Sequence, residues 1–312
     1  MALKRGIVDP HFHLIDVLNN PYPWFASSAP RPGIFAPSAP GPGIAARHGE
    51  HSREVFLAED FKAATAGQNV IKAVHVQANW DPADPVGETR WLAGVAGQHG
   101  IPHGVVGYAN LGLPTAEKIL AGHASFGFTR GIRLILSWDE ANPRLRFTDR
   151  PDYMSDEQWL KNYALLGKYN LSFDTQIYYS QMDETLALAR RFPGTPIIVN
   201  HAGMPLDRSE EGLTNWAEAM KRLAAADNVS VKISGLGIGQ QTWSVANCRD
   251  IVLTAIDAFG TDRSMFASNY PVDGSWADYD TLFDGFAHIT SDFTSGEQDK
   301  LFRRNAERIY RV

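Results

Sequence analysis

The sequence predicts an α/β protein, in particular a (β/α)₈ barrel of the TIM type that forms a single domain. Short apolar runs rich in β-branched residues alternate about eight times with amphipathic segments. Polar and ionisable residues follow many of these runs, and in a barrel the carboxyl ends of all strands converge on one site. No Gly-x-Gly-x-x-Gly turn follows the first run, although a doubly wound dinucleotide-binding sheet would usually carry one.

The apolar runs predict parallel strands that are covered on both faces, because runs such as 196–199 are apolar without interruption. The predicted strands are 6–13, 70–79, 104–110, 129–136, 171–177, 196–201, 229–234 and 264–269. The segments between them predict helices at 85–98, 115–124, 155–169, 182–192, 212–226, 245–259 and 276–289. Ser155, followed three residues later by Gln158, predicts the start of the third helix.

The length and one long insertion define the domain. A chain of 312 residues, 44% of them hydrophobic, suits one barrel, so we expect a single domain over 1–312. After the first strand, residues 26–52 form a Pro/Gly-rich loop in which no regular element is expected. We expect this insertion to cover the barrel mouth, because it follows the strand that carries His11 and His13. A solvated insertion without a partner is the alternative.

Charge and composition exclude several classes of partner. A formal net charge of −6 and a pI of about 5.9 offer no basic field for nucleic acid. No apolar run approaches the ~20 residues of a membrane span, and ionisable residues interrupt the N-terminal apolar stretch. We therefore expect a cytoplasmic protein without a membrane partner. The single cysteine, Cys248, cannot form an intramolecular disulfide and is expected to be buried on a helix.

The first predicted strand ends in two histidines at alternate positions, His11 and His13. Alternate residues of a strand share a face, so both imidazoles can bind one cation, and the pair predicts a metal site. Two histidines held only by backbone hydrogen bonds are the alternative. A third histidine, His201, ends the strand predicted at 196–201, before a turn with a glycine and a proline. We expect it to be a metal ligand or a catalytic group, with a structural role as the alternative.

Four separated motifs resemble the amidohydrolase superfamily. They are the His-x-His start, the His-Ala-Gly-x-Pro turn at 201–205, the Lys-Ile-Ser-Gly-Leu run at 232–236 and the Phe-Ala-Ser-Asn-Tyr-Pro-Val-Asp segment at 266–273. Within the superfamily, the chain resembles the amidohydrolase 2 group, which includes sugar lactonases and the pyrone-dicarboxylate lactonase. The resemblance extends from Ile7 to Tyr310. It implies a (β/α)₈ hydrolase that acts on lactones or related carboxylates, often with a divalent metal such as zinc.

The chain departs from this family at Asn269, where members commonly carry an aspartate. An amide cannot act as a general base, so we expect Asn269 to be a weak neutral ligand or an orienting group. Nearby Asp273 would then handle the proton, and a turn-capping role is the alternative for it. In some members of the superfamily, a carboxylated lysine at the end of the fourth strand bridges two metals. No lysine ends the fourth predicted strand here, so the resemblance implies a mononuclear site. Some lactonases of this group are thought to work without a metal, so a metal-free mechanism stays open.

Other polar residues at the strand ends are expected to bind the substrate. Arg133 can hold a substrate carboxylate in a bidentate fork, with a strand-to-helix salt bridge as the alternative. Lys232 can stabilise negative charge on a carbonyl oxygen, with a structural ion pair as the alternative. Four further residues are expected to hydrogen-bond an oxygen-rich substrate: Gln77, Asn79, Gln176 and Tyr178.

Taken with the resemblance, these residues predict the hydrolysis of a small lactone. One divalent ion, zinc by preference, would be held by His11, His13 and His201, polarise the ring carbonyl and activate the attacking water. The residues expected to act in catalysis are His201, Asn269, Asp273 and Arg133. A non-oxidative decarboxylase of a small aromatic or unsaturated acid is the first alternative, and a barrel that binds its ligand without turnover is the second. The identity of the substrate and assembly into a homo-oligomer stay open.

Overall fold

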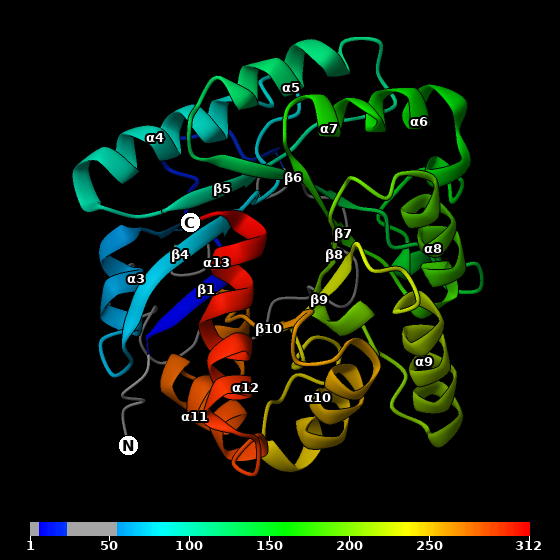
Figure 1. The fold of residues 1–312 in the computed structure, drawn as a ribbon. Helices are drawn as coiled ribbons and strands as arrows, with labels where there is room; N and C mark the ends of the chain where they lie inside the picture. The colour runs from blue at the N-terminus through cyan, green and yellow to red at the C-terminus, as the bar shows by residue number, and fades with distance from the viewer. Residues whose placement is uncertain (1–5, 24–54) are drawn as a thin grey trace.

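The computed structural model describes residues 6–23 and 55–312, and its central feature is a barrel of parallel strands (Figure 1). Eight strands pair in the order β1-β4-β5-β6-β7-β8-β9-β10, so each lies beside the next in the chain. They are β1 (Ile7–Phe12), β4 (Val70–Val76), β5 (Gly104–Gly107), β6 (Thr129–Ile135), β7 (Ser172–Gln176), β8 (Ile197–Val199), β9 (Val229–Ile233) and β10 (Ser264–Phe266). Every one of these strands falls within a predicted run.

The segment after the last strand meets the first strand, and this contact closes the barrel. The Asn269 amide donates a hydrogen bond to the His11 carbonyl at 2.8 Å, and the His13 amide donates one to the Tyr270 carbonyl at 2.7 Å. Phe12 and Tyr270 pair as a parallel bridge between these hydrogen bonds. The predicted (β/α)₈ barrel is therefore confirmed.

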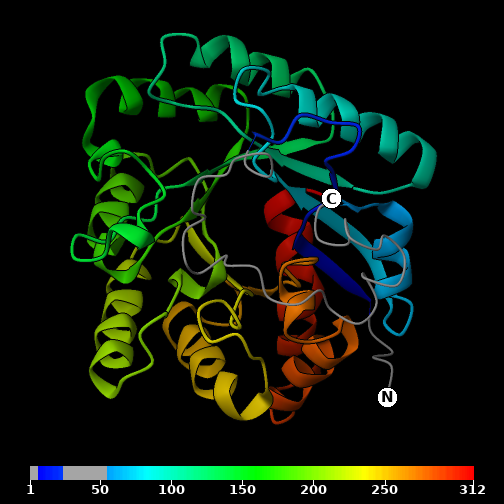
Figure 2. The same cartoon turned by 180° about the vertical axis from the view of Figure 1, so that it is seen from behind.

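Helices alternate with the strands along the chain, and α3 to α11 surround the barrel (Figures 1 and 2). The helices are α3 (Ala58–Ala64), α4 (Gly87–His99), α5 (Ala116–Ala124), α6 (Glu157–Tyr163), α7 (Leu165–Lys168), α8 (Met182–Arg191), α9 (Glu210–Leu223), α10 (Val245–Phe259), α11 (Tyr279–Ile289), α12 (Ser295–Asp299) and α13 (Asn305–Tyr310). Cys248 lies buried on α10, as predicted.

Several predicted helices begin one to three residues from the expected start, and in two of them a capping aspartate explains the difference. The start predicted at Ser155 is wrong, because Ser155 belongs to a preceding 3₁₀ turn. Asp156 caps α6 instead, and its carboxylate accepts a hydrogen bond from the Trp159 amide at 2.8 Å. The helix predicted at 276–289 begins only at Tyr279, where Asp278 provides the cap. In both cases an aspartate at the cap position sets the start.

The sequence pattern did not predict α3 or the C-terminal helices α12 and α13. A signal for α12 is present, because Thr294 and Glu297 form a capping box. The Thr294 amide donates to Oε2 of Glu297 at 2.9 Å, and the Glu297 amide donates to the Thr294 hydroxyl at 3.3 Å. Helix α13 follows and contacts β1 and β10.

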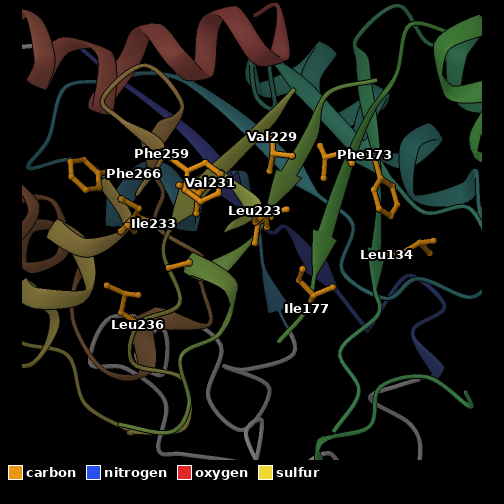
Figure 3. Close-up of a cluster of buried hydrophobic side chains, with 14 of the residues drawn as sticks. Leu134, Phe173, Ile177, Leu223, Val229, Val231, Ile233, Leu236, Phe259 and Phe266 are labelled. Atoms are coloured by element: carbon orange, nitrogen blue, oxygen red, sulfur yellow. The ribbon is translucent and has the colours of Figure 1, made fainter. Parts of the chain in front are cut away.

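Two apolar clusters stabilise the barrel. The larger lies between strands and helices, and Figure 3 labels a part of it that includes Phe173, Val231 and Phe259. The smaller cluster uses the other face of the same strands, so it lies inside the barrel. Its members are Val8, Val74, Val76, Val106, Ile198 and Met265 of the strands and Ala306, Ile309 and Tyr310 of α13. Because Val8 and Met265 lie near the starts of their strands, α13 closes the amino-terminal end of the barrel.

Outside the barrel, β2 (Ile15–Asp16) and β3 (Val55–Phe56) form a small antiparallel sheet. The predicted insertion 26–52 lies outside the described residues, so its expected role as a cover stays a prediction. In residues 6–23 and 55–312, no helix combines the length and the apolar character needed to cross a membrane.

Candidate active site

Three histidines gather at the carboxyl ends of β1 and β8. His11 and His13 lie at the end of β1, and His201 follows β8. The ring centroids of His11 and His13 lie 5.0 Å apart, and those of His11 and His201 lie 4.7 Å apart. The structure therefore brings together the three residues that the sequence predicted as metal ligands.

Hydrogen bonding fixes the tautomer of His13. Its Nδ1 lies 2.7 Å from the Val76 carbonyl oxygen, which can only accept, so Nδ1 carries the proton. Burial and then the Arg133 guanidinium lower the pKa of His13 to about 3, while the Asn269 side chain beside it acts in the opposite direction. His13 is therefore neutral at physiological pH, and its Nε2 keeps a lone pair for a ligand.

His11 is the most exceptional of the three histidines. Neither of its ring nitrogens has a hydrogen-bond partner among the described residues, although the side chain is fully buried. Burial lowers its pKa well below the usual range, and the charge of Lys232 adds to the effect. Buried polar atoms without partners are rare and call for an ion, a ligand or a water molecule. His11 thus indicates a binding site.

The backbone around His201 is strained. Residues 201–204 all have positive φ, with values of 55°, 52°, 69° and 54°. Left-handed backbone is unfavourable for residues other than glycine, and such strain clusters at functional sites. Nδ1 of His201 lies 3.0 Å from the Ser234 hydroxyl, and burial followed by Arg133 lowers its pKa well below the usual range. A Cβ on Gly235 would lie 2.6 Å from Nδ1 of His201, so the ring fits only against glycine.

Asn269 and Asp273 are joined by a hydrogen bond. Nδ2 of Asn269 donates to Oδ1 of Asp273 at 3.0 Å, and the Gly235 amide donates to Oδ2 at 2.9 Å. Burial raises the pKa of Asp273 to about 7, against the effect of these two hydrogen bonds. Oδ1 of Asn269 is buried without a partner among the described residues. Asp273 therefore fixes the Asn269 amide and leaves its oxygen free beside His13.

Arg133, on β6, is 4% exposed and forms no ion pair within the described part of the chain. Nη2 donates to the Gln77 carbonyl at 2.8 Å, Nη1 donates to Oε1 of Gln176 at 3.3 Å, and Nε has no partner there. Burial lowers its pKa to about 10, so the guanidinium remains charged near neutral pH. The salt bridge that was the alternative for Arg133 is not formed among the described residues, although the buried carboxylates of Asp174 and Glu88 act to raise its pKa.

Lys232 forms the buried ion pair that was its alternative. Nζ of Lys232 lies 2.6 Å from Oδ2 of Asp174, and both side chains are fully buried. The same carboxylate accepts hydrogen bonds from Asn200 and from the Tyr310 hydroxyl. The ammonium is thus bound inside the barrel, and a contact between Lys232 and substrate stays a prediction.

The other predicted substrate contacts lie in different surroundings. The backbone amide of Asn79 donates to Oε1 of Gln77 at 2.7 Å, so the side-chain oxygen of Gln77 is bound to the backbone of the same segment. The Tyr178 ring packs in a separate apolar cluster of loop residues. Gln176 contacts Arg133, and its Nε2 is buried without a partner among the described residues. Gln176 therefore offers the site a free donor beside Arg133.

Asp9 also belongs to this region, although the sequence patterns did not single it out. Its Oδ1 accepts hydrogen bonds from the His11 amide at 3.2 Å and the Ser268 amide at 3.1 Å. Its Oδ2 accepts one from the Tyr279 hydroxyl at 3.1 Å. These bonds tie β1 to the segment after β10. The alternation of Asp9 with His11 and His13 is the signal that could have found it.

The imidazole donors fit a divalent ion chemically, because all three are neutral and His11 and His13 keep ring nitrogens available. No carboxylate joins them. Among residues 6–23 and 55–312, no three His, Cys, Asp or Glu side chains form a ready metal-binding group. An ion at this site would therefore depend on imidazole nitrogens and the amide oxygen of Asn269, without the carboxylate that many catalytic zinc sites include.

Comparisons with known proteins agree with the fold. The family model described as Amidohydrolase matches residues 8–312. The uncharacterized protein y4mH of Sinorhizobium fredii is 42% identical over 309 residues, which cover 98% of this chain and 99% of that protein. An L-fucono-1,5-lactonase of Burkholderia multivorans is 29% identical over 241 residues, which cover 72% of this chain and 76% of the lactonase.

A solved structure has the same architecture over its whole length. The crystal structure of an amidohydrolase from Burkholderia multivorans with bound zinc gives a TM-score of 0.75 at 24% sequence identity. The match covers 99% of this chain and 100% of that chain. At this identity the likeness concerns the fold.

Proposed function

The chain belongs to the amidohydrolase family and is a hydrolase, and we propose that it opens a small lactone that also carries a carboxylate. Three neutral imidazoles beside a buried guanidinium that forms no ion pair in the described part of the chain support this proposal. The imidazoles suit the ester carbonyl of a lactone, and the guanidinium suits an acid group elsewhere in the same molecule. The relative that is named as a lactonase supports a lactone as the substrate, and the carboxylate is proposed from Arg133 alone.

The observation that carries the proposal is the buried guanidinium of Arg133, which forms no ion pair among the described residues and whose Nε has no partner there. A buried guanidinium without a counter-ion is strongly unfavourable unless a bound anion compensates it. Nε of Arg133 and Nε2 of Gln176 are donors without partners among the described residues, and the two side chains are hydrogen-bonded to each other. A carboxylate has two oxygens that can accept from both. We therefore assign the acid group of the substrate to Arg133 and Gln176.

The opposite side of the site would act on the ester carbonyl. Where no ion is bound, the neutral imidazole of His11 would donate its N–H to the carbonyl oxygen as negative charge develops there. Oδ1 of Asn269 can accept a hydrogen bond from the attacking water and orient it. Asp273, with a pKa of about 7, would take the proton that water loses and return it to the ring oxygen as the ester bond breaks.

The family resemblance also implies a divalent ion, and zinc is the metal that we propose. His11, His13 and His201 would hold it, and it would polarise the ester carbonyl as a Lewis acid. The carboxylate contact through Arg133 and the orientation of water by Asn269 do not depend on the ion.

A panel of lactones with and without a carboxylate tests this proposal, with acid release followed in time and products identified by mass. We expect hydrolysis of carboxylate-bearing lactones, and a loss of roughly tenfold or more in kcat/KM for them in Arg133→Ala. The absence of hydrolysis across the panel would contradict the proposal. Carbon dioxide release from an aromatic or unsaturated acid would identify the decarboxylase, and tight binding without turnover would identify the ligand-binding barrel.

A further inference from the structure

Asp174 precedes Gln176 by two residues on β7, so both side chains lie on the same face of the strand. The buried carboxylate of Asp174 accepts hydrogen bonds from three donors. The Tyr310 hydroxyl lies 3.0 Å from Oδ1 and 2.8 Å from Oδ2 of Asp174. Oδ2 also accepts hydrogen bonds from Nζ of Lys232 at 2.6 Å and from Nδ2 of Asn200 at 3.1 Å. Within the described residues, Tyr310 is therefore the partner on which Oδ1 depends.

Arg133 lies next to this carboxylate but forms no ion pair with it. Arg133 and Asp174 are in register between β6 and β7, and residues in register on neighbouring strands point to the same face. The carboxylate also acts to raise the pKa of Arg133, as a neighbouring negative charge should. A buried guanidinium would ordinarily take such a carboxylate as its counter-ion. Here Tyr310 and Lys232 already donate hydrogen bonds to the carboxylate oxygens of Asp174.

We propose that Tyr310 is a specificity-determining residue: its hydroxyl holds Asp174 away from Arg133 and keeps the guanidinium free for the substrate carboxylate. Without this hydroxyl, Oδ1 of Asp174 would be a buried acceptor with no partner among the described residues, on the strand next to Arg133, whose Nε is also unpaired there. The two groups would pair, because buried polar atoms are costly when unpaired. The inference rests on the proposed function, since it takes Arg133 as the residue that binds the acid group.

Tyr310 can be altered without disturbing the packing around it. It lies on α13, 136 residues after Asp174 in the chain, and its ring belongs to the cluster inside the barrel. The ring centroid also lies 4.7 Å from Nζ of Lys232, in position for a cation–π contact. Phenylalanine keeps the ring, its packing and this contact, so Tyr310→Phe removes little besides the hydroxyl.

Two lactones of similar shape provide the first test. The lactone of glucaric acid carries a carboxylate where the corresponding lactone of gluconic acid carries a hydroxymethyl group. For Tyr310→Phe we expect KM for the glucaric lactone to rise about tenfold, with KM for the gluconic lactone and both kcat values nearly unchanged. Tyr163→Phe is the matched control, because the Tyr163 hydroxyl is buried on α6 without a partner among the described residues, and it should change neither KM. Equal rises for both lactones, or no rise for the glucaric lactone, would overturn the proposal.

Binding of glutarate, a dicarboxylate that cannot be hydrolysed, separates this inference from the proposed function. If the wild-type protein hydrolyses neither lactone, the proposed function fails, but calorimetry with glutarate still reports on Arg133. We expect Tyr310→Phe to raise the glutarate Kd about tenfold. In an Asp174→Asn background, the same change should have no effect, because an amide cannot neutralise the guanidinium. An unchanged Kd in Tyr310→Phe, or no glutarate binding to the wild-type protein, would overturn the inference.

Discussion

At the scale of single residues, burial keeps the imidazoles of the site neutral and leaves a carboxyl group to titrate near neutral pH. The pKa of His13 is lowered to about 3, and those of His11 and His201 lie well below their usual range. The pKa of Asp273 is raised to about 7 by the same physical cause. The pH dependence of the reaction should therefore follow the ionisation of the Asp273 carboxyl group.

We expect kcat/KM to rise with pH through a midpoint of about 7, because the proposed base is active when Asp273 is ionised. Asp273→Asn should remove this rise and cost far more activity than the ~0.5 kcal/mol typical of a neutral surface change. Asn269→Asp should remain folded and bind metal at least as well as the wild-type protein. Profiles of rate against pH for the three proteins check this, and full turnover in Asp273→Asn would leave Asp273 with only a structural role.

The same pKa predicts an effect on stability. A carboxyl group whose pKa is raised from 3.8 to about 7 on folding holds its proton more tightly in the folded protein. The stability from this group is complete below about pH 4 and is lost as pH rises through about 7. Urea unfolding should therefore show wild-type protein losing stability relative to Asp273→Asn over this range. A constant difference between the two proteins would contradict the raised pKa.

The proposed ion gives a prediction at His13, whose Nε2 has the free lone pair. Elemental analysis of protein purified without chelator should find about one equivalent of divalent metal or less. His13→Ala should lower this content, and His99→Ala should not, because His99 pairs with Glu59 on the surface. Complete activity in metal-free protein would remove the ion from the mechanism.

At the scale of elements, the turn after β9 supports the turn after β8, and glycine is required where they meet. Gly235→Ala adds a Cβ 2.6 Å from Nδ1 of His201 at a φ of 65°, so it should lower kcat strongly and stability by about 1–2 kcal/mol. Gly239→Ala is the matched control, with a φ of 79° and a Cβ that meets only the end of the Leu206 side chain at 3.1 Å. Assays and urea unfolding should show a similar stability loss but retained kcat in the control. Loss of kcat in both variants would mean that backbone strain alone explains the effect.

The strands could be predicted because short runs rich in β-branched residues alternate with amphipathic segments, and β8 is apolar throughout, as strands covered on both faces often are. The same patterns located His13, His201 and Asn269, since these residues end the predicted strands. The tautomer of His13 could not be predicted, because it depends on the Val76 carbonyl, 63 residues away.

The long-range hydrogen bonds that position the site residues could not be predicted from the sequence either. The contact between Tyr310 and Asp174 spans 136 residues and requires α13 to dock against the barrel. The bond from the Ser268 amide to Asp9 spans 259 residues and requires the barrel to close. Local periodicity carries no information about such pairs. The chemistry at the strand ends could therefore be inferred, while the hydrogen bonds that orient it could not.

At the scale of the whole molecule, α13 fills one end of the barrel with apolar side chains. Ile309→Ala removes part of this filling, so the free energy of unfolding should fall by about 2–4 kcal/mol. Ile71→Ala is the control, because Ile71 is 41% exposed and should cost much less. Denaturant unfolding measures both variants. Equal losses would show that α13 adds little to the stability of the barrel.

The closing contact between β1 and the segment after β10 has a consequence for the folding of the chain. His11 and His13 lie near the beginning of the sequence and Asn269 near its end, and the backbone hydrogen bonds that close the barrel join these same residues or their neighbours. During synthesis, a nascent chain can form its early strands long before the last strand emerges. A partly folded intermediate, even one with every other strand in place, lacks Asn269 beside the histidines. Recovery of activity on refolding should therefore lag behind recovery of secondary structure, since it reports the last docking step.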